Sequence, residues 1–183
     1  NEKYFENEKF KKYFNSANNI LTLKKNTITI DENIFIPENY LVKIFKDQEI
    51  ILINNAFIFS NSSWQAIGEK NKEILITGNK NNFGGGLIIK ETRGRSDFKY
   101  VRFKFLNGLK KSFYSDKEEI LYTSQTYYLE GDKNNFKERI IEKNNKPIYD
   151  YNLMGSINFF NTNLKLENVN FEKISSEDAI NII

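Results

Sequence analysis

The chain has 183 residues, enough for one domain with a buried core, and its 39% hydrophobic and 28% charged residues are typical of a globular protein. The absence of Cys and His excludes disulfides, thiolate or His-ligated metal sites and Ser-His-Asp catalysis from this chain. The net charge of +3 comes from 27 basic and 24 acidic residues that are interspersed, which argues against a nucleic-acid surface, and no apolar run is long enough for a membrane span.

Residues 1–25 are predicted to form an N-terminal capping or linker segment. Over 4–14, five aromatic residues alternate with lysines and glutamates, which favours a short amphipathic helix that covers the open end of a β core. The chain does not begin with Met, and it ends within an apolar strand pattern at Asn181–Ile183. We therefore expect both ends to be cuts, with the C-terminus in the middle of a coil.

A repeat begins after residue 25. Apolar residues at positions i and i+2 mark short strands with one buried face, at Ile28/Ile30, Ile51/Ile53, Ile74/Ile76, Ser96/Phe98 and Leu164/Leu166. Their second members are separated by 23, 23, 22 and 68 residues. A second series, Ile44, Ile67, Ile89, Phe159 and Ile182, has separations of 23, 22, 70 and 23.

This spacing predicts an all-β fold over 26–183, namely a right-handed parallel β-helix with about 22–23 residues and three short strands per coil. The alternative is an antiparallel sandwich, whose strands would recur every 8–12 residues or so. Asn recurs between paired strands, as at Asn54-Asn55, because it tolerates the left-handed conformation of a tight bend. Gly84-Gly85-Gly86 predicts a corner where the backbone passes close to a neighbouring coil.

The large separation in both series predicts an insertion at about 108–154. The segment from Lys110 to Asn152 is rich in Tyr, Lys and Glu. Loops of this length in compact domains are usually functional or disordered. We consider two roles for its tyrosines, an ordered flap that stacks on sugars and packing against the coils.

Four segments resemble successive coils of the pectin-lyase-like superfamily of right-handed parallel β-helix repeat proteins. They are Ser63-Trp64-Gln65-Ala66-Ile67-Gly68, Glu73-Ile74-Leu75-Ile76-Thr77-Gly78, Gly84-Gly85-Gly86-Leu87-Ile88-Ile89 and Ser175-Ser176-Glu177-Asp178-Ala179-Ile180-Asn181-Ile182. The chain also resembles the β-helix region of large exported bacterial proteins that carry a CotH-like kinase domain. The resemblance implies a secreted or cell-surface protein and acidic polysaccharide as a partner, together with further coils or domains of the same polypeptide.

Candidate ligand-binding residues lie on two strands. Because Val101, Phe103 and Phe105 are expected to point inward, Arg102 and Lys104 would point outward and meet a uronate carboxylate. The neighbouring Asp97 would also point outward, to a cation or a base, and the alternative for all three residues is an ordinary solvated face. Trp64, the single tryptophan, offers a flat platform for a sugar or, alternatively, packs in the core.

Glu177 and Asp178 are candidates for a metal site. Adjacent carboxylates at a corner, together with carbonyl oxygens, suit Ca²⁺, the one cofactor for which the sequence offers ligands. The alternative is a turn in which the Asp178 side chain bonds nearby backbone amides.

The superfamily's lyases and hydrolases use Ca²⁺-binding carboxylates with a basic residue, or paired Asp residues, and neither constellation is complete here. We therefore expect a noncatalytic β-helix scaffold that is glycan-binding or adhesive. Two alternatives stay open, a fragment of a polysaccharide lyase, hydrolase or epimerase with catalytic coils beyond residue 183, and a structural spacer.

Overall fold

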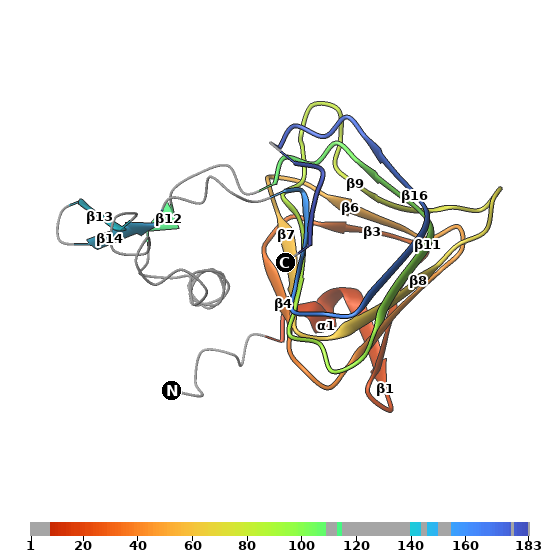
Figure 1. Cartoon of the computed structure of the whole chain (residues 1–183). Coiled ribbons are helices and arrows are strands. Elements are labelled where there is room, and N and C mark those ends of the chain that lie inside the picture. The colour runs from red at the N-terminus through yellow and green to blue at the C-terminus, as the bar shows by residue number, and fades with distance from the viewer. Residues whose placement is uncertain are drawn as a thin grey trace.

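The computed structural model describes residues 8–108, 113–114, 140–143, 146–149, 155–176 and 178–182. Its regular structure is almost entirely β-strand, and most strands pair in parallel (Figure 1). Within these ranges the one helix, α1 (Phe10–Tyr13), is a four-residue turn, and no helix has the length and hydropathy needed to cross a bilayer. The predicted all-β class is confirmed.

The strands form three parallel ladders. The first ladder holds β2 (Ile20–Leu23), β5 (Leu41–Phe45), β8 (Ser63–Ile67) and the first halves of β11 (Ser96–Lys104) and β16 (Leu164–Glu172). The second holds β3 (Thr27–Ile30), β6 (Glu49–Leu52), β9 (Ile74–Thr77) and the second halves of β11 and β16. The third holds β4 (Ile34–Ile36), β7 (Phe57–Ser60), β10 (Gly86–Lys90), β15 (Ile157–Phe160) and β17 (Ile180–Ile182).

The chain visits the first, second and third ladders in that order and then returns to the first (Figure 1). Positions paired across neighbouring passes are 21 to 24 residues apart at Ile20↔Leu41, Leu41↔Ser63 and Ile34↔Ile58. They are 26 to 32 apart at Ile50↔Ile76, Gly86↔Phe57 and Asp97↔Gln65. The spacing is therefore less regular than the predicted 22–23, because loops at 68–73, 78–85 and 91–95 add residues to some corners.

The two predicted strand series mix ladders. Ile76 pairs with Ile50 rather than with the predicted Ile53, and Ile67 pairs with Phe45 rather than with Ile44. Ile67 consequently faces outward and is 44% exposed. By contrast, the predicted alignment of Ile89 with Phe159 and of Phe159 with Ile182 is confirmed in the third ladder.

Left-handed residues make the tight bends. Asn54 and Asn55, with φ of 58° and 56°, form the predicted bend before β7. Tyr100 and Asn168, with φ of 50° and 54°, bend β11 and β16 so that each continues from the first ladder into the second. A residue with a short polar side chain suits this conformation, which explains the recurrence of Asn.

The glycines before β10 lie against the neighbouring pass, as predicted. A Cβ on Gly85 would lie 2.4 Å from the Asn55 carbonyl oxygen, and one on Gly86, which has φ of +138°, would lie 1.9 Å from the Ser156 carbonyl oxygen. Only glycine permits this close approach of backbones.

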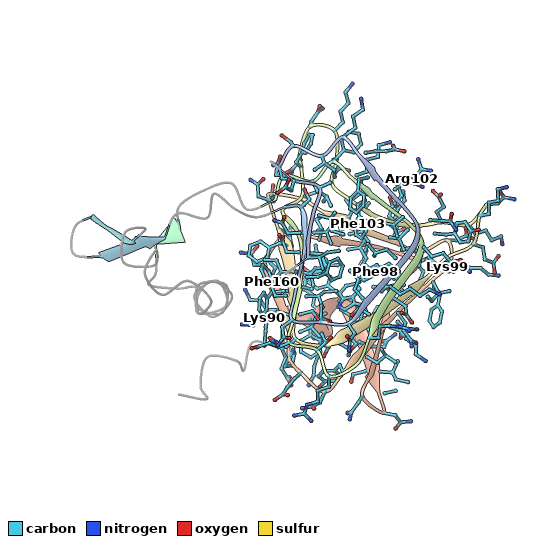
Figure 2. The ribbon with its side chains drawn as sticks, in the orientation of Figure 1. Lys90, Phe98, Lys99, Arg102, Phe103 and Phe160 are labelled. Atoms are coloured by element: carbon cyan, nitrogen blue, oxygen red, sulfur yellow. The ribbon has the colours of Figure 1, made fainter. Side chains whose placement is uncertain are left out.

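The core lies between the three ladders. Phe98 and Phe103 point into it, whereas Lys99 and Arg102 point outward (Figure 2). The predicted inward orientation of Val101 and Phe103 is confirmed, but Phe105, with φ of 52°, turns away and Leu106 is buried in its place. In the third ladder both faces of β7, β10 and β15 are buried.

The N-terminal segment covers the first pass. Phe10 and Tyr13 of α1 join the core, and β1 (Phe14–Ala17) pairs antiparallel with β2 through the Asn18-Asn19 turn. The predicted helix over 4–14 is therefore shorter within the described residues, because the chain from Phe14 onward forms a hairpin. The third, separate sheet consists of β12 (Phe113–Tyr114), β14 (Lys146–Tyr149) and β13 (Ile140–Lys143), and the rest of the predicted insertion lies outside the described residues.

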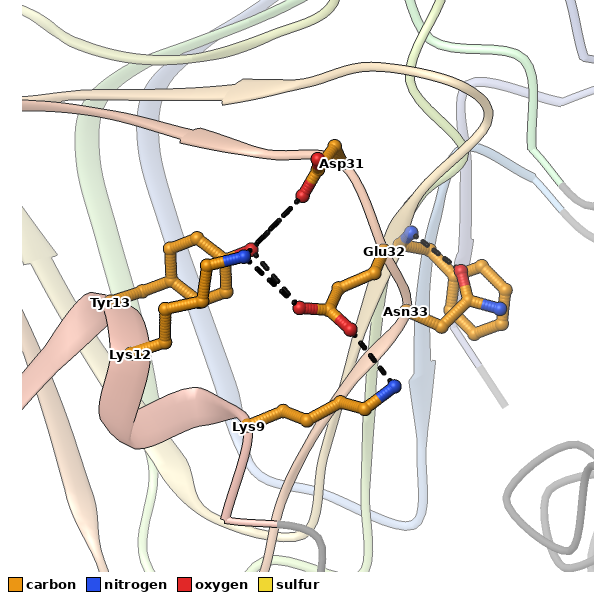
Figure 3. A network of polar contacts seen from close by, with 7 residues as sticks. Lys9, Lys12, Tyr13, Asp31, Glu32 and Asn33 are labelled. Carbon is orange, nitrogen blue, oxygen red and sulfur yellow. Dashed lines mark hydrogen bonds and ion pairs between the residues drawn. The ribbon is translucent and has the colours of Figure 1, made fainter.

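A polar network holds this N-terminal segment to the first pass (Figure 3). The Glu32 carboxylate accepts from Lys9 Nζ at 2.9 Å and from Lys12 Nζ at 3.3 Å. Tyr13 Oη donates to Asp31 Oδ1 at 3.2 Å. The hydrogen bond from Lys9 is the main cause that lowers the pKa of Glu32 below its ordinary value of 4.5.

Candidate functional site

A groove of about 630 Å³ follows the corner where the chain passes from the third ladder to the first. Its walls come from consecutive passes, because each pass contributes a corner and the start of a strand of the first ladder. We call it the amide groove, and it is lined by Asn18, Asn19, Ile20, Asn39, Tyr40, Leu41, Asn61, Ser62, Ser63, Gln65, Arg93, Gly94, Arg95 and Asp97.

Serine hydroxyls fix the walls of the amide groove. Ser62 Oγ donates to the Pro37 carbonyl oxygen and accepts from the Tyr40 amide at 3.0 Å, which joins two passes. Ser63 Oγ accepts from the Gly94 amide at 3.2 Å, which joins the next pair. The groove is thus built by bonds between passes rather than by one loop.

Carboxamides in this groove have unused hydrogen-bonding capacity. The side chains of Asn18, Asn19, Asn39 and Gln65 form no hydrogen bond with another residue that the structure describes. The three asparagines have left-handed backbones, with φ of 50°, 59° and 73°, and are exposed at their corners. Each carboxamide presents both a donor and an acceptor to the groove.

Two arginines stand at the far wall. Arg95 donates to Asp97 in bidentate fashion, from Nε at 2.6 Å and Nη2 at 3.1 Å, and this pairing raises the pKa of the guanidinium. Arg93 Nη2 donates to Glu38 Oε2 at 3.1 Å from a side chain that is 79% exposed. The structure thus places the predicted residue Asp97 in the groove, where its charge is balanced by Arg95.

The predicted residues Arg102 and Lys104 lie elsewhere, on the outer face of the second ladder. Arg102 Nε donates to Glu73 Oε2 at 2.8 Å, Nη1 donates to Glu172 Oε1, and Lys104 Nζ lies 3.4 Å from Glu172 Oε2. The hydrogen bond with Glu73 is the main cause that raises the pKa of Arg102. Both cations face outward as predicted, but carboxylates of neighbouring passes already occupy them, as in the alternative of a solvated, charged face.

Trp64 lies in the core. Its side chain is fully buried, its ring stacks on Phe98 with centroids 6.3 Å apart, and its Nε1 donates to Ser60 Oγ at 3.0 Å. A buried ring presents no platform to a sugar at the surface, so the packing alternative describes its position.

Of the predicted metal site, Glu177 lies outside the described residues. Asp178 is exposed, and its carbonyl oxygen accepts from Ser176 Oγ at 2.6 Å and from the Ser156 amide at 3.1 Å. Among the residues that the structure describes, no group of three or more carboxylates is placed to hold a metal ion.

Sequence reasoning missed the carboxamides of the amide groove. Gln65 alternates with Trp64 and Ala66 on one strand, so its outward orientation could have been inferred from their apolar character. The corner asparagines could be recognised as bends, but their alignment along one edge depends on a register that the sequence left ambiguous.

Comparison of the chain with models of protein families, with curated proteins and with solved structures found no match.

Proposed function

We propose that the chain is part of a right-handed parallel β-helix that binds a glycan in the amide groove without reacting with it, on an exported or cell-surface protein. The cyclic order of the three ladders supports the helix, since each pass returns to the first ladder one strand further along. Connections between parallel strands of one sheet are right-handed in nearly all proteins, which supports the hand.

The observation that carries the proposed binding role is the row of unpaired carboxamides in the amide groove. Sugar hydroxyls both donate and accept, so Asn18, Asn39 and Gln65 offer matching partners along the groove. The groove draws its walls from several passes, which suits an extended polymer better than a small ligand.

The groove carries little chemistry. Among the described residues that line it, Asp97 is the one carboxylate, and Arg95 binds both of its oxygens. Hydrolysis of a glycosidic bond ordinarily needs two carboxyl groups, one as an acid and one as a base or nucleophile. This favours binding over catalysis for the amide groove.

The test is a titration of the protein with a panel of neutral and acidic polysaccharides, with and without Ca²⁺, followed by calorimetry and proton NMR. We expect selective binding of one polymer with unchanged sugar signals. Gln65→Ala should weaken this binding about three- to tenfold, the range expected for one lost hydrogen bond. The matched control is Asn170→Ala, which removes an exposed carboxamide of β16 outside the groove.

Three results contradict the proposal. New unsaturated or reducing-end signals would establish a polysaccharide-degrading enzyme. Failure to bind any polymer of the panel would favour the structural spacer. Equal effects of Gln65→Ala and Asn170→Ala would remove the amide groove as the site.

A further inference from the structure

A second hollow adjoins the amide groove. It has a volume of about 390 Å³ and is lined by Phe35, Pro37, Glu38, Asn61 and Glu91. Asn61 lines both spaces, and the Glu38–Arg93 ion pair joins a residue of one to a residue of the other. Both partners of this pair are more than half exposed, so the contact contributes little energy and a ligand that crosses it disrupts little.

The two spaces differ in chemistry. The second hollow has Phe35 and Pro37 as apolar walls, and the Phe35 ring stacks on Phe59 with centroids 5.3 Å apart and an interplanar angle of 23°. The Asn61 carboxamide is already engaged, because its Nδ2 donates to the Lys90 carbonyl oxygen at 3.3 Å.

The carboxylates of the second hollow are also engaged. Glu38 pairs with Arg93 at 3.1 Å, and Glu91 lies 3.6 Å from Nζ of Lys90, whose side chain is buried. Each negative charge therefore has a cation beside it, which argues against a cation site. The surface that remains for a ligand is chiefly apolar.

We propose that the second hollow holds an apolar substituent, such as an O-acetyl group, of the glycan whose hydroxyls bind in the amide groove. This inference rests on the proposed function and adds a substituent preference to it. An acetyl methyl group that leaves water against Phe35 and Pro37 gains about 0.8 kcal/mol, which corresponds to about fourfold in affinity.

The experiment compares partially O-acetylated glucomannan with the same polymer after mild alkaline removal of its acetyl groups. Should another neutral polymer of the panel bind more tightly, that polymer is used with and without chemical O-acetylation. We expect the wild-type protein to bind the acetylated form about fourfold more tightly. Phe35→Ala should abolish this difference and keep the affinity for the deacetylated polymer.

Phe45→Ala is the matched control, because Phe45 is a 51% exposed phenylalanine of β5 outside both spaces, and the preference for acetyl groups should survive it. Circular dichroism checks that each variant is folded. A second measurement needs no variant: in saturation-transfer NMR on the wild-type protein, the acetyl methyl protons should receive more saturation than the ring protons.

Equal or weaker binding of the acetylated polymer, a preference that Phe35→Ala leaves unchanged, or weaker saturation of the methyl protons would overturn this inference alone. In those cases binding of the deacetylated polymer persists and the proposed function stands. Absence of binding to every polymer would overturn both.

Discussion

The sole tryptophan allows a direct test of the core. Trp64→Ala removes a fully buried ring that stacks on Phe98, together with the hydrogen bond from Nε1 to Ser60 Oγ. Replacement of a buried aromatic residue by alanine costs about 3–5 kcal/mol, because the lost transfer free energy adds to that of the cavity. We expect a decrease of this size in the free energy of unfolding, measured by urea titration with circular dichroism.

A milder change separates the ring from its hydrogen bond. Trp64→Phe keeps most of the apolar contact and removes the bond to Ser60 Oγ, which still donates to the Ser62 carbonyl oxygen at 2.9 Å. The loss should therefore be about 1–2 kcal/mol. A double-mutant cycle with Ser60→Ala should yield a coupling of about 0.5–1.5 kcal/mol.

The control is Leu166→Ala in β16, where the side chain is 36% exposed and the expected loss is correspondingly smaller. In the wild-type protein, Trp64 fluorescence should be typical of an apolar environment and resist quenching by iodide. A loss below about 1 kcal/mol for Trp64→Ala, or ready quenching by iodide, would refute the placement of this ring in the core.

Two further predictions concern the N-terminal network and the insertion. Because the folded state lowers the pKa of Glu32, its pairing with Lys9 and Lys12 is fully present above the ordinary value of 4.5 and is lost as the pH falls through the lowered pKa. Acidification from about pH 6 to pH 3 should thus lower the melting temperature more in the wild-type protein than in Glu32→Gln, and parallel curves would contradict this. Deletion of Lys110 to Asn152 should leave the three ladders intact, and loss of the β signal in circular dichroism would show otherwise.

The class of fold follows from alternation in the sequence, but the register does not. In Ile50-Ile51-Leu52-Ile53 all four residues are apolar, so the sequence cannot tell which two face inward, and the structure buries Ile50 and Leu52. A shift of one residue moves every side chain of a strand to the other face. Corner loops of variable length then conceal the error, because a false period of 23 remains plausible.

The site illustrates a similar limit. The outward orientation of Arg102 could be predicted from its apolar neighbours, but its partners Glu73 and Glu172 lie 29 and 70 residues away in the sequence. Asp97 could be placed on a surface, whereas its pairing with Arg95 depends on the conformation of the 91–95 corner. Orientation is local information, and partnership across passes requires the register.

The insertion also affects how quickly the protein can fold. Leu21 of β2 must find Val42 across 21 residues, whereas Phe98 of β11 must find Leu166 across 68. The entropy of loop closure makes the longer search about 1 kcal/mol more costly. The small sheet of β12, β13 and β14 forms inside that span and shortens the distance that the chain must explore. The early passes can therefore assemble on the N-terminal segment while synthesis continues, and the pairing of β16 with β11 sets the pace.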